Sequence, residues 1–175
     1  QGAGAMRVWI DVAGGRPEAA TADVDLREVR LKLRPDLPLL DVTALAGRLT
    51  GAALPDGLRL GAEKLVLATR EGPGIGPLDF SLRRTVPQGD GQAGGGEFTA
   101  NGLDLGALAR LAGHLPLNEA MRSRLDAYRP QGKVFDVDFR WAERAEETEI
   151  LAVRARFENL GLQATAALPG FSGLS

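Results

Sequence analysis

Apolar and polar residues alternate along most of this chain, and that alternation limits its fold more than any other feature. Residues 6–12, which read MRVWIDV, form the first such segment, and others lie at 20–26, 29–34, 65–69, 78–83, 134–141 and 151–157. Successive side chains of a β-strand point to opposite faces of its sheet. The pattern therefore predicts strands with apolar side chains on one face and polar side chains on the other.

A pair of helices interrupts the strands. Asp104 and Asn118 are residues of the type that caps helix N-termini, and each precedes apolar residues at helical spacing. Strands come before and after this pair, which is expected near residues 104–129, so the order does not fit alternating βα units. We expect a mainly β protein of the α+β class, in which about ten short strands form an antiparallel sheet, curved or sandwich-like, with one apolar face. The helices are expected to cover part of that face or to cap one end.

The chain has 175 residues, enough to bury a core of its own. We divide it into a β-strand section at residues 1–86, a flexible Gly-rich loop at 87–96 and a strand–helix–helix–strand section at 97–175. These sections are expected to form one continuous unit. Both chain ends, Gln1 and Ser175, are expected to be internal positions of a longer protein.

Composition argues against several classes of function. The net charge is −2 and the basic residues are spread along the chain, whereas nucleic-acid binders carry a basic stripe. The chain has no cysteine, which excludes disulfides and Cys-based zinc sites. No apolar run approaches the length of about 20 residues that spans a bilayer. We expect a soluble fragment that does not bind nucleic acid.

Residue types that carry catalysis or bind metals are sparse. His114 is the single histidine, it follows an expected helix end, and no Gly-x-Ser-x-Gly elbow accompanies it. The Asp-x-Asp pairs at 23–25 and 136–138 suit calcium or acid–base chemistry, but their alternation with apolar residues is typical of a polar outer face. The Gly-rich stretches 72–77 and 94–96 lack the features of a phosphate-binding loop. We expect no enzyme activity, no metal site and no cofactor.

The alternating aliphatic face is the feature that suggests a function. Strands lie about 4.8 Å apart, so roughly eight to ten of them make an apolar track of roughly 40 Å. Acyl chains of one leaflet, which span about half of a 30 Å hydrocarbon core, fit on such a track. The candidate groove residues are Val29, Leu31, Leu33, Leu65, Leu67, Leu78, Phe80 and Leu82.

The same alternation also fits other functions. A closed core needs the same pattern, so a filled interior stays open beside a lipid groove. In that case the chain is a structural or adaptor module. A glycan-binding β-module is a further alternative, in which Trp9 or Trp141 stacks on a sugar. If the apolar face is exposed, self-association through it is also expected.

Three phrases in the second half are similar to those of a known family. They are GEFTANGLDLGALARLAGHLPL at 96–117, YRPQGKVFDVDFRW at 128–141 and RFENLGLQATAALPGFSGLS at 156–175. Their order and spacing resemble the YhdP-type proteins of the AsmA-like superfamily, whereas residues 6–85 resemble the family only as generic strand repeats.

The resemblance implies a large envelope protein of Gram-negative bacteria, with an inner-membrane anchor and a long periplasmic β-rich body. A hydrophobic groove in that body would carry phospholipid between the inner and outer membranes. This chain would be an internal periplasmic section, and the resemblance offers no catalytic residues.

Overall fold

The computed structural model describes residues 2–70, 72, 74–87, 89, 93–115, 117, 119–144, 147–165 and 169–175. Its strands are β1 (Ala3–Ala13), β2 (Arg16–Leu31), β3 (Leu40–Leu54), β4 (Gly57–Thr69), β5 (Ile75–Thr85), β6 (Gly94–Asp104), β7 (Gln131–Arg144), β8 (Glu147–Leu162) and β9 (Phe171–Leu174). Its helices are α1 (Leu105–Leu111), the short 3₁₀ helix η1 (Ala112–His114) and α2 (Glu119–Tyr128). The predicted α+β class and the predicted helical pair are confirmed.

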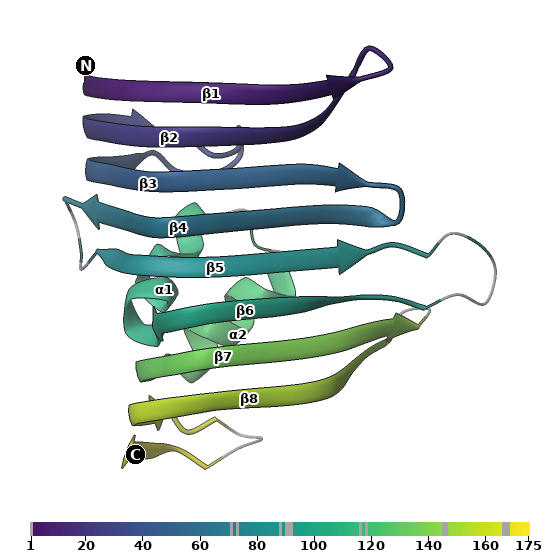
Figure 1. Cartoon of the computed structure of the whole chain (residues 1–175). Helices are drawn as coiled ribbons and strands as arrows, with labels where there is room; N and C mark the ends of the chain where they lie inside the picture. The colour runs from purple at the N-terminus through teal and green to yellow at the C-terminus, as the bar shows by residue number, and fades with distance from the viewer. Residues whose placement is uncertain are drawn as a thin grey trace.

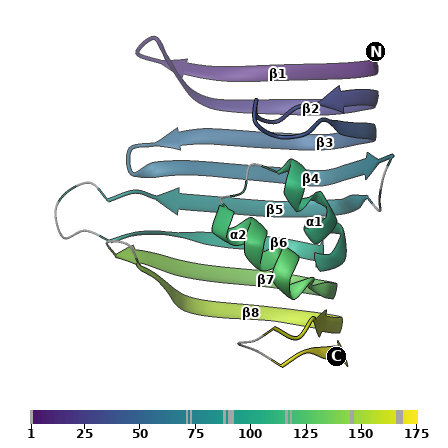
Figure 2. The same ribbon diagram turned by 180° about the vertical axis from the view of Figure 1, so that it is seen from behind.

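The nine strands form one antiparallel sheet whose spatial order is the chain order, from β1 to β9 (Figure 1). The N- and C-termini consequently lie at opposite edges of the sheet (Figure 1). Both α-helices lie on the same face (Figure 2). Of the two arrangements that the sequence left open, the structure has a single open sheet, and within the described residues no second sheet packs against it.

A cluster of buried apolar residues lies between α1 and the sheet. Leu111 of α1 packs against Leu40 and Val42 of β3, and all three are buried. Partly buried residues surround this cluster, and they are Leu31, Leu45, Leu67, Ile75 and Leu115. The helices thus cover the apolar face towards the end of the sheet where β3 begins and β4 ends.

Asp104 fixes the start of α1, as its residue type and position predicted. Its backbone is extended, with φ −84° and ψ 105°, and its Oδ1 accepts a hydrogen bond of 2.8 Å from the N–H of Ala107. Because β6 ends at Asp104, this cap turns the chain directly from the sheet onto its apolar face. The second predicted cap, Asn118, lies outside the described residues.

Backbone irregularities explain why the sequence pattern predicts shorter strands than the structure contains. Glu28, Lys64, Asp136 and Asn159 have φ values of 50°, 51°, 50° and 51°, and each lies inside a strand. An extra or left-handed residue shifts the alternation by one position while the strand continues. The pattern therefore breaks at these residues and gives about ten short strands, whereas most strands have 11 to 16 residues.

Side chains replace ladder hydrogen bonds at one of these irregularities. The N–H of Lys64 donates to Asp79 Oδ1 at 2.6 Å, and the N–H of Asp79 donates to Asn101 Oδ1 at 3.0 Å. Asn101 Nδ2 in turn donates a hydrogen bond of 3.0 Å to Asp79 Oδ2. These bonds join β4, β5 and β6 where regular pairing is interrupted.

Some predicted boundaries are wrong. β6 begins at Gly94, so Gly94–Gly96 belong to a strand and not to the predicted 87–96 loop, of which residues 88 and 90–92 lie outside the described residues. β2 ends at Leu31, so Leu33 lies in the connection to β3. Pro35 lies within a turn there, which the hydrogen bond of 3.1 Å from the N–H of Leu37 to the carbonyl oxygen of Arg34 closes. β8 ends at Leu162, and β9 was not predicted, because its four residues include a glycine.

Candidate functional site

One row of directly opposed residues crosses eight strands and is entirely apolar or small. It runs through Ile10, Ala20, Gly51, Leu60, Leu82, Phe98, Phe139 and Val153. We call it the central apolar row. Directly opposed residues of neighbouring strands share a face. At about 4.8 Å per strand, the row extends for about 34 Å.

The adjacent row, one residue along each strand, has the opposite character. It consists of Trp9, Thr21, Thr50, Gly61, Ser81, Thr99, Asp138 and Arg154. We call it the polar row. The sheet therefore has an apolar face, which carries the helices, and a polar face, and the predicted separation of side chains is present across the whole sheet.

The central apolar row is not sealed from solvent. Ile10 is 59% exposed, Leu60 43% and Val153 63%. The remaining residues of the row are exposed or partly exposed, so no position of the row is buried. Figure 2 shows why, because α1 and α2 cover only part of this face and leave the strands of both flanks open. On β1 the exposed apolar side chains continue at Met6, Val8 and Val12. A sheet face of this kind can hold elongated apolar molecules by the hydrophobic effect.

The predicted groove residues are divided between the covered and the uncovered parts of this face. Leu82 belongs to the central apolar row, and Phe80 lies beside it in the next row towards the helices, opposite Ala62. Leu78 is buried and pairs with Leu65. Val29 pairs with Val42 of the buried cluster, while Leu31 and Leu67 pack against that cluster. Leu33 lies outside the strands.

Several uncovered residues were absent from the predicted set, notably Met6, Ile10 and Val153. Their alternation is visible in the sequence, but alternation does not show where helices will cover a sheet. Leu60 is a further example, since it pairs with Leu82 across the open part of the face. The sequence offered one indication that these residues stay uncovered, which is their separation along the chain from the helical pair.

The acidic pairs lie among arginines. Asp23 Oδ1 is 2.7 Å from Arg48 Nε, and this hydrogen bond holds the pKa of the Asp23 carboxyl below its usual range. Arg156 pairs with Asp136, and Arg140 Nη2 is 3.2 Å from Asp138 Oδ2. The described residues contain no group of three or more His, Asp or Glu side chains placed to hold a metal ion. The polar outer face predicted for these residues agrees with this arrangement.

The chain as a whole matches a known family. A family model described as YhdP protein matches residues 1–175. The chain belongs to the YhdP family. The match includes the N-terminal half, in which the YhdP resemblance rested only on generic strand repeats. YhdP is an envelope protein family, as the resemblance implied. Comparisons with curated proteins and with solved structures found no match.

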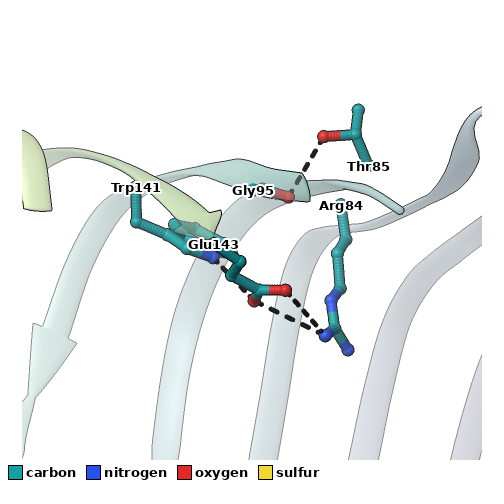
Figure 3. Close-up of polar contacts among 5 residues, drawn as sticks. All are labelled: Arg84, Thr85, Gly95, Trp141 and Glu143. Atoms are coloured by element: carbon teal, nitrogen blue, oxygen red, sulfur yellow. Dashed lines mark hydrogen bonds and ion pairs between the residues drawn. The ribbon is translucent and has the colours of Figure 1, made fainter. Parts of the chain in front are cut away.

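No helix in the described part of this YhdP-family chain is long and apolar enough to cross a membrane. The apolar face of the sheet carries the central apolar row. It is not uniformly apolar, because one polar cluster lies on it near the strand ends (Figure 3).

That cluster joins β5 and β7 across β6. Glu143 accepts a hydrogen bond of 3.1 Å from the indole N–H of Trp141 at Oε1, and Arg84 Nη2 lies 3.1 Å from Oε2 (Figure 3). The Trp141 hydrogen bond, assisted by Arg84 and opposed by partial burial, holds the pKa of the Glu143 carboxyl below its usual range. Glu143 is consequently ionised at neutral pH, and Arg84 balances its charge.

Proposed function

We propose that this chain is a non-catalytic, periplasmic section of an envelope protein whose apolar β-face carries phospholipid between the inner and outer membranes. The observation that carries the proposal is the central apolar row, which continues across eight strands without a polar residue and is open to solvent. Membership in the YhdP family supports the same proposal.

The dimensions of the row suit acyl chains. A chain of one leaflet spans about 15 Å, half of the hydrocarbon core of a bilayer. The row of about 34 Å accommodates such a chain laid across the strands. Contact with exposed side chains such as Ile10, Leu60 and Val153 removes apolar surface of both lipid and protein from water, at about 25 cal/mol per Å².

An open face also favours lipid over a purely structural role. Large exposed apolar patches on soluble proteins mark interaction sites, because their exposure is otherwise costly. A second copy of the chain is the competing occupant of this face, and oligomeric state separates the two cases. The glycan-binding alternative gains no support, since Trp9 lies in the polar row and Trp141 beside the central apolar row.

Lipid extraction and mass spectrometry of the purified chain test the proposal. The informative variant is Leu60→Glu, which places a charge in the central apolar row. Val66→Glu is its matched control, because Val66 lies in the same strand, is 36% exposed against 43% for Leu60, and points to the polar face. We expect phospholipid with the parent chain and with Val66→Glu, and about tenfold less with Leu60→Glu.

Two outcomes contradict the proposal. Absence of lipid from the parent chain, combined with a stable dimer in sedimentation, assigns the face to self-association. Equal lipid loads in both variants place the bound lipid elsewhere than on the apolar face.

A further inference from the structure

The Arg84–Glu143 pair differs in location from the other cross-strand ion pairs. Arg48–Asp23 and Arg140–Glu97 lie on the polar face, where charged rows are expected. Within the described residues, Arg84–Glu143 is the one ion pair whose partners both lie in rows of the apolar face.

The neighbours of this pair are apolar. Arg84 is opposed by Leu58 on one side and by Gly96 on the other, and Gly96 is opposed by Trp141, which pairs with Ile150. This row lies next to the central apolar row, two residues nearer the strand ends. A lipid held on the central apolar row therefore has these charged groups within reach of its headgroup.

The local geometry keeps both charges accessible. A side chain at Gly96 would occupy the space of the indole ring, so its absence lets Trp141 lie over β6 and donate to Glu143. Arg84 contacts Glu143 through Nη2 at 3.1 and 3.4 Å, and about half of its side chain is exposed. The Glu143 side chain is 30% exposed, so an anion can approach the guanidinium and a cation can approach the carboxylate.

We infer that Arg84, Glu143 and Trp141 form a headgroup site for phospholipids that carry both a phosphate and a primary amine. The phosphate accepts hydrogen bonds from Arg84, and the ammonium donates to Glu143. The indole of Trp141 lies at the boundary between headgroup and acyl chains, the position that tryptophan favours at membrane interfaces. This inference rests on the proposed lipid-binding function and adds the substrate class.

The charge balance of the site selects among headgroups. A zwitterionic amine-phosphate headgroup finds a partner for each of its charges. A phosphatidylglycerol headgroup offers a phosphate to Arg84 but carries no ammonium to replace Arg84 as the partner of the Glu143 carboxylate. A choline headgroup has no N–H to donate. Partly exposed ion pairs contribute little to stability, so exchanging the Arg84–Glu143 contact for contacts with a zwitterion costs little.

Short-chain lipids that stay monomeric in water allow the site to be tested on the full chain. We would titrate dihexanoyl phosphatidylethanolamine and dihexanoyl phosphatidylglycerol into a Trp9→Phe background, in which Trp141 is the only indole and reports binding by fluorescence. The variants are Arg84→Gln and Glu143→Gln. Arg48→Gln, which removes an arginine of the polar face, is the matched control.

We expect the ethanolamine lipid to bind more tightly than the glycerol lipid. Its Kd should rise about tenfold in Arg84→Gln and in Glu143→Gln and stay unchanged in Arg48→Gln. Glu143→Gln should also abolish the preference for ethanolamine over glycerol. Equal binding of the two lipids by the parent chain, or unchanged binding in both site variants, overturns the headgroup site while leaving the apolar face as a lipid carrier. Failure of both lipids to bind the parent chain overturns the proposed function itself.

Discussion

The indole ring of Trp141 lies directly over Gly96, its opposite residue in the neighbouring strand. A Cβ atom added to Gly96 would be 2.3 Å from Cζ2 and 2.4 Å from Cη2 of that ring. The same atom would be 2.7 Å from the carbonyl oxygen of Arg83. Glycine at this position is therefore required by a close approach of an aromatic ring on one side and backbone on the other.

Gly96→Ala should destabilise the chain by about 1–3 kcal/mol, since the added methyl group must displace either the indole or the backbone. Urea denaturation measures the change. Gly51→Ala is the matched control, because Gly51 is also a strand residue of the apolar face and its nearest neighbour would be Leu60 Cδ2 at 3.5 Å. The control should change stability by no more than about 0.5 kcal/mol. Similar losses in the two variants would show that the ring does not constrain Gly96.

Leu111→Ala should cost about 2–5 kcal/mol of unfolding free energy, because it opens a cavity between α1 and the buried Leu40 and Val42. Thermal and urea unfolding measure the effect. Leu151→Ala removes the same side chain from an exposed position of β8 and should change stability by no more than about 0.5 kcal/mol. A small loss in Leu111→Ala would mean that α1 does not seal this part of the sheet.

Asp104→Ala should cost about 1 kcal/mol, because the N–H of Ala107 loses the hydrogen bond that starts α1. Asp104→Asn keeps a side-chain oxygen at the cap and should restore most of the stability. Hydrogen exchange of the α1 amides, measured in parallel, should rise in the alanine variant alone. Equal exchange in the two variants would assign the start of the helix to packing and not to the cap.

Trp141→Phe should raise the pKa of Glu143, because it removes the hydrogen bond that contributes most to lowering it. A carboxyl whose pKa is lower in the folded chain stabilises the fold above its unfolded-state pKa. That stabilisation is lost as pH falls through the folded-state pKa. The acid-side loss of stability due to Glu143 should therefore be smaller in Trp141→Phe than in the parent chain.

Carboxyl NMR titration measures the Glu143 pKa directly. Asp23 provides an internal control on the opposite face, where the hydrogen bond from Arg48 lowers its pKa. Asp23 should titrate unchanged in Trp141→Phe and should shift upward in Arg48→Gln. An unchanged Glu143 pKa in Trp141→Phe would rule out the indole as its main stabilising partner.

The two faces of the sheet follow from the sequence. Alternation along β1 assigns Ile10 to the apolar face and Trp9 to the polar face, and a two-residue period in a strand leaves no other arrangement. The cap residue Asp104 likewise marked the start of the helical pair, because the signal is local. The left-handed residues Glu28 and Lys64 made the predicted strands too short, since such a residue shifts the alternation without ending the strand.

The strands, the sidedness of their side chains and the presence of two helices were thus predictable from local sequence, because all three depend on residues close together in the chain. Three other features are visible only in the folded chain. The sheet is a single open layer, α1 covers Val42 while Leu60 stays open, and Arg84 meets Glu143 across β6. These outcomes depend on contacts between distant segments. The same alternating pattern satisfies a closed core and an open face equally well, so local periodicity cannot choose between them.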